Sequence, residues 1–283
     1  MTNVILLVLI AVAIFVAAAF LYVSRIISLP PEGRAVDYLK SKLKNNQRVI
    51  ACIGDSLTHG NIGQSWVDYL RKGFPNDVFL NEGINGNTVW QVIQRVDPIL
   101  ACKPDIVILM IGSNDAMGSF NEKSGLRYKR NNNLPEAPSF EKYKEQLPEL
   151  IEKIGDQSKI AICTLPPIGE NVNSEVNKHV NQFNDYIKMT VTQKNLSLMP
   201  VSDAIWSDIQ SRTYPLKLEY NSKAMPLLMK RILGGIFHHY LFKKSWNDIS
   251  RAKGQWILFD QIHLNERGAE IVYKLAKDYI SKA

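Results

Sequence analysis

Residues 49–58 decide the fold, and they read Val-Ile-Ala-Cys-Ile-Gly-Asp-Ser-Leu-Thr. The first five are apolar, and the valine and isoleucines among them favour a strand. The run does not alternate in polarity, which is typical of a parallel sheet with helices over both faces. It leads directly into Ser56, and open sheets of this kind bind ligands at the carboxyl ends of their strands. We therefore expect Ser56 to face a crevice.

Further strand-like runs follow, separated by segments with helical spacing. In residues 89–96 and 271–279 apolar residues recur every three or four positions. Alternating strands and helices indicate a parallel sheet. The expected fold is therefore α/β, a three-layer α/β/α sandwich with a mainly parallel sheet of about five strands. The further strand-like runs are residues 78–80, 106–111, 160–163 and, more weakly, 196–201.

The amino terminus differs from the rest of the chain. Residues 4–23 contain no charge, proline or glycine. Twenty helical residues at about 1.5 Å each span roughly the 30 Å of a bilayer core. We expect one transmembrane helix in residues 1–25, a connector and first helix in residues 26–45, and the main domain in residues 46–283. A cleaved signal peptide is the alternative, but its apolar core would be shorter, and no lysine or arginine precedes this run.

Charge and cysteine content bear on the class of protein. The net charge of +7 comes from basic residues spread along the 283-residue chain, not gathered in one block, so we expect no nucleic-acid partner. Attraction to anionic lipid headgroups is the simpler explanation for an anchored chain. Three cysteines do not indicate a disulfide framework, because Cys52 and Cys163 lie in apolar strand-like runs.

Ser56 needs a partner if it is to react. A serine hydroxyl is a weak nucleophile at neutral pH and requires an oriented base, usually a histidine. His263 is the best placed of the five histidines, because Asp260-Gln261-Ile262-His263 brings a carboxylate and an imidazole to one side of a turn. Asp260 can then hold the tautomer of the ring and stabilise its charged form. We expect Asn265 to cap the helix that follows.

Acyl transfer also requires donors aimed at an oxyanion. The ends of the second and third strand-like runs supply residues 81–88 and 112–115, in which the backbone N–H of Gly86 and the side-chain amide of Asn114 suit that role. His238 and His239 are adjacent, so on a helix they diverge by about 100° and are poorly placed to share a metal. We expect no metal site.

These blocks together resemble the GDSL/SGNH hydrolase superfamily. The matching blocks are Gly54-Asp55-Ser56-Leu57, Gly86, Gly112-Ser113-Asn114-Asp115 and Asp260-Gln261-Ile262-His263, in that order, and the resemblance covers residues 48–280. It implies a flavodoxin-like SGNH fold and no cofactor. It also implies roles: Ser56 as nucleophile, His263 as base and Asp260 as its partner, with an oxyanion hole made by the N–H of Ser56, Gly86 and Asn114.

Three neighbours of these blocks receive lesser roles. Asp55 is expected to orient the serine turn through hydrogen bonds rather than to move protons. His59 is expected either in a loop or in a position that supports the catalytic residues without touching the substrate, and Asp115 is expected to brace the loop of Asn114.

The interval before Asp260 departs from compact members of the superfamily. Residues 225–246 are rich in Leu, Ile, Phe, Lys and Arg, with a break expected at Gly234-Gly235. We expect a helical insertion at about 205–255, made of one or two amphipathic helices. A packed helix pair is the ordinary interpretation, and a lid or acyl-chain wall is the alternative.

The leading hypothesis is a serine ester hydrolase that forms an acyl-serine and acts on lysophospholipid or another acyl ester near the membrane. A carbohydrate O-acetyl esterase or acyltransferase is the alternative. A third hypothesis is a non-catalytic membrane-bound binding scaffold, since a fold alone does not imply activity. The side of the membrane stays open: cations after the span, such as Arg25 and Arg34, favour the cytoplasm, whereas family habit favours the opposite side.

Overall fold

The computed structural model describes residues 2–41, 47–223 and 225–283. Its centre is a five-stranded sheet in the order β2-β1-β3-β4-β5. All four strand pairings are parallel, with Ile50 level with Phe79 on one side and with Ile106 on the other. The strands are β1 (Val49–Gly54), β2 (Val78–Gly83), β3 (Ile106–Met110), β4 (Lys159–Cys163) and β5 (Ser197–Met199).

Both faces of the sheet are buried, which explains the continuous apolar runs. In β1, Ile50 and Cys52 belong to one hydrophobic cluster, and Ala51 and Ile53 belong to the other. All four are fully inaccessible to solvent. A strand whose alternate side chains meet two different cores cannot have a polar face.

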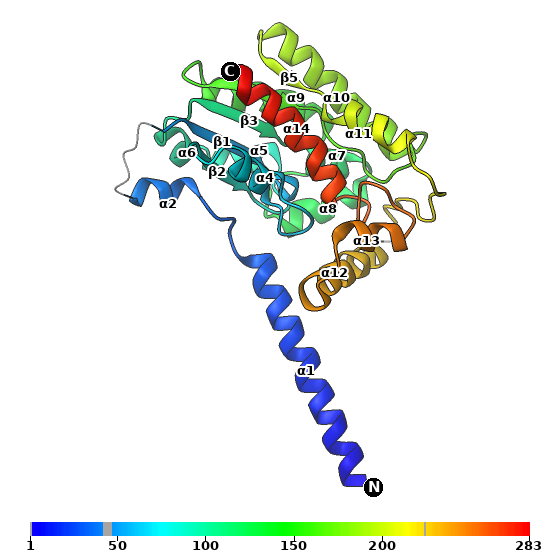
Figure 1. The fold of residues 1–283 in the computed structure, drawn as a ribbon. Helices are drawn as coiled ribbons and strands as arrows, with labels where there is room; N and C mark the ends of the chain where they lie inside the picture. The colour runs from blue at the N-terminus through cyan, green and yellow to red at the C-terminus, as the bar shows by residue number, and fades with distance from the viewer. Residues whose placement is uncertain (1, 42–46, 224) are drawn as a thin grey trace.

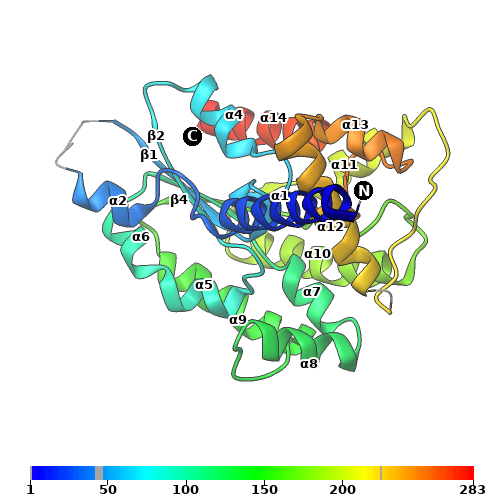
Figure 2. The ribbon, with the colours of Figure 1, turned by 90° about the horizontal axis from the view of Figure 1, so that it is seen from below.

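Helices cover both faces. Residues of α4, α11 and α14 join one hydrophobic cluster, and residues of α5, α9 and α10 join the other. The two sets lie on opposite sides of the sheet (Figure 2). The predicted three-layer α/β/α sandwich is therefore confirmed. The helices after the first are α2 (Ala35–Lys40), α3 (Ser56–His59), α4 (Trp66–Gly73), α5 (Val89–Arg95), α6 (Asp97–Ala101), α7 (Ser113–Ser119), α8 (Glu122–Asn131), α9 (Phe140–Ile154), α10 (Glu175–Gln193), α11 (Val201–Gln210), α12 (Met225–Phe242), α13 (Trp246–Ala252) and α14 (Glu266–Lys282).

The first helix, α1 (Thr2–Ser28), projects from the domain into open space (Figure 1). It is long and apolar enough to cross a membrane, and most of its side chains are exposed. Its last turn is fixed to the domain. The side chain of Asn61 donates hydrogen bonds to the carbonyls of Ile26 and Ile27, at 3.1 and 3.0 Å, and Asn85 donates to Ile27 at 3.2 Å. These bonds satisfy carbonyls that a helix end leaves without partners.

The expected break at Gly234-Gly235 is wrong, because α12 runs unbroken through both glycines. Gly235 is required for packing rather than for a turn. A methyl group at this position would lie 2.5 Å from the ring of Phe259, so only glycine lets the helix approach that ring. Gly234 faces open space, because a methyl group added there would have no other atom within 4 Å. Tertiary contact thus overrides the low helix propensity of glycine.

Candidate active site

The site lies where the strand order reverses. β1 pairs with β2 on one side and with β3 on the other, so the loops that leave these strands diverge and open a crevice. Ser56 follows β1, Gly86 follows β2 and Asn114 follows β3. The fourth segment, Asp260 to His263, precedes α14. The sheet topology therefore gathers the four sequence blocks at one edge.

Ser56, His263 and Asp260 form one hydrogen-bonded chain. The Nε2 atom of His263 lies 3.0 Å from Oγ of Ser56, and its Nδ1 atom lies 2.6 Å from Oδ2 of Asp260. The other carboxylate oxygen of Asp260 accepts the backbone N–H groups of Ile262 and His263, at 2.9 and 2.8 Å. Such an imidazole can take the proton of the serine hydroxyl while the buried carboxylate holds its other nitrogen.

The buried carboxylate of Glu170 supports the segment that leads into the turn of His263. Glu170 accepts the backbone N–H groups of Trp256, Ile257 and Leu258, at 2.7–2.9 Å, and also pairs with Arg212 at 3.1 Å. Its side chain is fully buried. Three consecutive donors directed at one carboxylate fix the backbone that leads into Asp260.

An aromatic column supports the ring of His263. Phe259 stacks on that ring with centroids 6.0 Å apart, Trp246 packs on Phe259 at 4.3 Å, and His239 stacks on Trp246 at 4.1 Å. Trp246 belongs to α13 and His239 to α12. The helices before Asp260 therefore position the imidazole, in addition to forming one wall of the site.

Two backbone donors near Ser56 are free. Among the residues that the structure describes, the N–H groups of Ser56 and Gly86 donate to no protein acceptor. Ser56 begins the short helix α3, and Gly86 has a φ of +79°, a conformation that favours glycine. Free N–H groups that border a cavity can bind developing negative charge.

Asn114 is held by three hydrogen bonds. Its amide nitrogen donates to Oδ2 of Asp55 at 3.1 Å and to the carbonyl of Asn87 at 3.0 Å, while its oxygen accepts from Tyr128 at 2.9 Å. The two acceptors and the one donor fix which end of the amide is nitrogen. Both amide hydrogens are thus engaged, unlike the N–H groups of Ser56 and Gly86.

Asp55 links Asn114 to the serine turn. Its second oxygen accepts the N–H of Leu57 at 2.9 Å, which gives it the orienting contact expected from the sequence. Burial raises the pKa of Asp55 from 3.8 to about 6, against the lowering effect of the hydrogen bond from Leu57. At neutral pH this carboxyl is therefore ionised, but it gains a proton at a higher pH than an exposed aspartate.

A cavity of about 480 Å³ opens beside Ser56 and His263. The α12 side chains of Leu228, Met229 and Ile232 form an apolar wall. The polar part of the lining includes Asn85, Gly86, Asn114, Arg127, Asn131 and Asn132. A volume of this size suits a small-molecule ligand.

Two sequence candidates lie beside the triad and not in it. His59 is buried and makes no hydrogen bond to Ser56, His263 or Asp260 in the described part of the chain. Burial, aided by the charge of Arg34, lowers the pKa of His59 to about 4, so it is neutral at pH 7. Asp115 accepts the N–H of Val89 at 3.3 Å, which braces the start of α5 against α7.

Sequence reasoning missed several residues of the site. Tyr128, Asn85 and Arg127 line the cavity, and Glu170 supports the histidine turn. Asn85 could have been found, because it directly precedes Gly86. The other three belong to no motif, and the partners of Glu170 lie 86–88 residues further along the chain.

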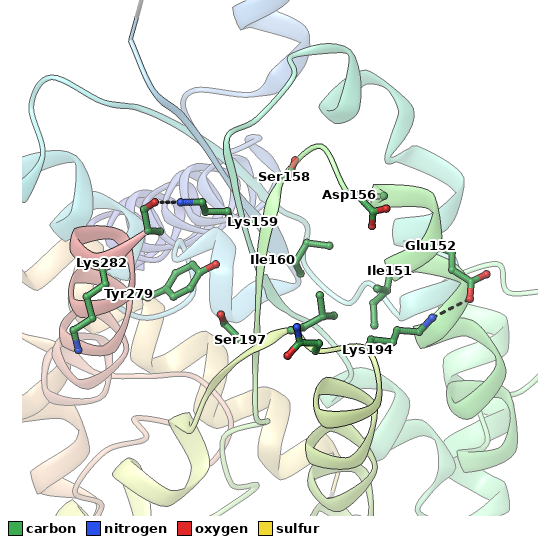
Figure 3. A pocket seen from close by; sticks show the side chains of 14 residues that line it. Ile151, Glu152, Asp156, Ser158, Lys159, Ile160, Lys194, Ser197, Tyr279 and Lys282 are labelled. Atoms are coloured by element: carbon green, nitrogen blue, oxygen red, sulfur yellow. Dashed lines mark hydrogen bonds and ion pairs between the residues drawn. The ribbon is translucent and has the colours of Figure 1, made fainter.

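A larger cavity, of about 960 Å³, lies at the opposite end of the strands (Figure 3). It is bordered by the starts of β4 and β5 and by the end of α14. Lys194 pairs there with Glu152 at 2.9 Å, and Lys159 bonds to the carbonyl of Ala283. No histidine lines it. Nor does any group of three or more His, Cys, Asp or Glu side chains suited to a metal occur among residues 2–41, 47–223 and 225–283.

A parallel α/β/α sandwich with a Ser-His-Asp arrangement at its switch point is typical of serine hydrolases. Residues 52–271 match the model of the GDSL-like lipase/acylhydrolase family, and the chain belongs to this family. It is accordingly an ester-bond hydrolase. No curated protein matches the sequence.

Solved structures with the same fold include two acetyl xylan esterases and a lipase/acylhydrolase. The acetyl xylan esterase AlAXEase is 17% identical, with a TM-score of 0.54 over 82% of this chain and 99% of that one. A variant of Axe2, an acetyl xylan esterase from Geobacillus stearothermophilus, is 19% identical, with a TM-score of 0.56 and coverages of 82% and 94%. The lipase/acylhydrolase from Enterococcus faecalis is 18% identical, with a TM-score of 0.52 and coverages of 83% and 95%. These likenesses concern the fold.

Proposed function

We propose that this hydrolase acts through an acyl-serine intermediate, with Ser56 as nucleophile and His263 as general base. The chain of short contacts from Ser56 through His263 to Asp260 carries this proposal. Oγ of Ser56 attacks the ester carbonyl carbon while its proton passes to Nε2 of His263. The bond to the alcohol then breaks, and His263 returns the proton to the departing alcohol. Water repeats the sequence on the acyl-serine and releases the acid.

The free N–H groups of Ser56 and Gly86 are the primary oxyanion donors in this proposal. Asn114 contributes the third donor, through a hydrogen shared between the oxyanion and one of its present acceptors, Asp55 or Asn87. Preorganised donors of this kind each contribute about 10²–10³ in kcat.

For the substrate, we propose a lysophospholipid or related acyl ester taken from a membrane surface. The apolar wall of Leu228, Met229 and Ile232 suits an acyl chain. Arg127 also lines the cavity and has no carboxylate partner among the described residues, so its guanidinium suits a phosphate. Asn85 also lines the cavity, and its amide suits a free hydroxyl of the alcohol portion.

We also propose that α1 is a retained membrane anchor rather than a cleaved signal. The uncharged apolar run of residues 4–23 supports this, because it is longer than the roughly 7–15 residues of a signal-peptide core.

The second candidate is a carbohydrate O-acetyl esterase. The polar half of the cavity favours it, because Asn85, Asn131 and Asn132 suit a sugar. The acetyl xylan esterases of similar fold give it further support.

The test uses the full chain in detergent micelles, with p-nitrophenyl esters from acetyl to palmitoyl, lysophosphatidylcholine and acetylated xylooligosaccharide. Ser56→Ala and His263→Ala should each lower kcat by at least about 10³. A fluorophosphonate should label wild type at Ser56 and leave folded Ser56→Ala unlabelled. Folded wild type that neither labels nor hydrolyses any ester would contradict the mechanism.

Arg127→Gln separates the two substrates. It should lower kcat/KM for lysophosphatidylcholine and leave hydrolysis of a neutral monoacylglycerol with the same chain nearly unchanged. Turnover restricted to acetyl esters would favour the carbohydrate candidate instead.

A further inference from the structure

Helix α12 exposes large apolar side chains outside the stripe that packs against the domain. Leu228, Ile232 and Ile236 are buried against the domain. The rest of the helix surface should be polar in a helix that only covers a core. Instead Leu227, Met229 and Leu233 are 40–46% exposed, and Phe242 at the end of the helix is 58% exposed.

This surface lies beside α1. Among the described elements, α12 is the one that packs most against α1. Figure 1 shows α12 at the end of the domain from which α1 projects, and in Figure 2, viewed from that side, the two helices cross. Most side chains of α1 are exposed, but Ala19 and Val23, one turn apart, are only 5% exposed. Tyr240 of α12 donates to the carbonyl of Asn61, next to the end of α1.

The position along α1 at which α12 packs can be compared with the depth of a membrane interface. The apolar run of α1 ends at Val23, just before Ser24 and Arg25. Ala19 lies four residues earlier, or about 6 Å along the axis. Helices that lie in a membrane interface bury their apolar side about 5–10 Å deep. A helix packed against α1 between Ala19 and Val23 is therefore at interfacial depth.

The lysines on α12 and directly after it also suit a position at a membrane interface. Lys230 is exposed on the helix, and Lys243 and Lys244 follow directly after it, also exposed. Lysines that flank an apolar surface place their ammonium groups among lipid phosphates while their stems cover apolar surface. A soluble partner protein would not require this surface to lie beside a membrane-spanning helix.

We propose that the exposed surface of α12 binds the lipid interface of the bilayer that α1 crosses. The active-site cavity then opens at that interface, because Met229 is both exposed on α12 and part of the cavity wall. An amphiphile can pass from the leaflet to Ser56 along α12 without entering bulk water. The proposal rests on the anchoring role of α1, but not on the identity of the ester.

The test places a fluorescent label on the full-length chain in phosphatidylcholine vesicles that contain doxyl-labelled lipid. Leu233→Cys puts the label on α12. Met189→Cys on α10, which is similarly exposed at 45%, is the matched control on the far side of the molecule. The three native cysteines are buried, so the introduced thiol reacts selectively. Doxyl lipid should quench the label at position 233 strongly and leave the label at position 189 unchanged.

Equal, weak quenching at both positions would overturn the proposal. Shielding of position 233 that rises with protein density, without doxyl quenching, would assign the surface to a second copy of the chain and overturn it as well. Retention of the protein on vesicles after an alkaline wash reports on anchoring by α1 alone. A failure of anchoring is therefore distinguished from a failure of α12 to bind the lipid interface.

A second variant gives a functional readout. Leu233→Glu should reduce hydrolysis of an ester embedded in vesicles several-fold and leave hydrolysis of p-nitrophenyl acetate unchanged, because Leu233 does not line the cavity. A loss of both activities would indicate that the variant damages the site, and equal retention of both would count against the interfacial role. The quenching result does not depend on activity, so it holds even if the proposed substrate is wrong.

Discussion

At the scale of single residues, Asp55 joins the serine turn to the loop of Asn114. Its two oxygens accept from Leu57 and from Asn114, which lie after different strands. Asp55→Asn replaces one of these two accepting oxygens by an NH2 group. That NH2 group would face either the N–H of Leu57 or the amide nitrogen of Asn114, and both of these are donors. A hydrogen bond to a charged group contributes about 1.5–3 kcal/mol. We expect kcat to fall roughly ten- to a hundredfold, measured with p-nitrophenyl acetate. An unchanged kcat would show that Asn114 is positioned without Asp55.

The same carboxyl predicts a pH dependence of stability. Its pKa in the folded chain is about 6, above the ordinary 3.8, so between these values the folded state binds the proton more tightly than the unfolded state. The contribution of Asp55 to folding therefore becomes less favourable as pH rises from about 4 to about 6, and is constant above that. The unfolding free energy of Asp55→Asn, relative to wild type, should rise over this window. Urea unfolding at several pH values measures the difference in unfolding free energy between variant and wild type. A difference that does not change between pH 4 and pH 6 would refute the prediction.

At the scale of elements, the two adjacent glycines of α12 provide a matched pair of substitutions. Gly235→Ala places a methyl group against Phe259, the ring that stacks on His263. We expect it to cost about 1–3 kcal/mol in unfolding free energy and to lower kcat, because the imidazole loses its support. Gly234→Ala meets nothing and should stabilise the helix by about 0.5–1 kcal/mol. Equal effects of the two substitutions on urea unfolding and kcat would contradict this packing.

At the scale of elements, the sequence predicts the strands and the helix cap that depend only on neighbouring residues. Continuous apolar runs marked the first four strands and a weaker run marked β5, and Asn265 caps α14 as expected by accepting the N–H of Gly268. The continuity of α12 was not predictable, because the close approach of Gly235 to Phe259 depends on the assembled domain. Glu170 was missed for the same reason, since its partners lie 86–88 residues further along the chain.

At the scale of the whole molecule, the free cysteines lie inside the core. Cys52, Cys102 and Cys163 are all buried, and burial raises their pKa values, to about 12 for Cys52 and about 11 for Cys102. Because the thiolate is the reactive form, we expect the native chain to resist maleimide and iodoacetamide. All three should react once urea unfolds the protein. Mass spectrometry of labelled samples checks this, and fast modification of any of them in native buffer would contradict it.

The carboxylate of Glu170 also has a consequence for biosynthesis. It joins the segment after β4 to the segment before α14, and Ser56 and His263 lie 207 residues apart. Chains fold from the amino terminus as they are made, so α1 and most of the sheet are synthesised long before the histidine turn. We therefore expect α1 to leave the ribosome while Ser56 still lacks its contact with His263. The hydrogen-bonded chain of Ser56, His263 and Asp260 is completed only when the segment before α14 has been made.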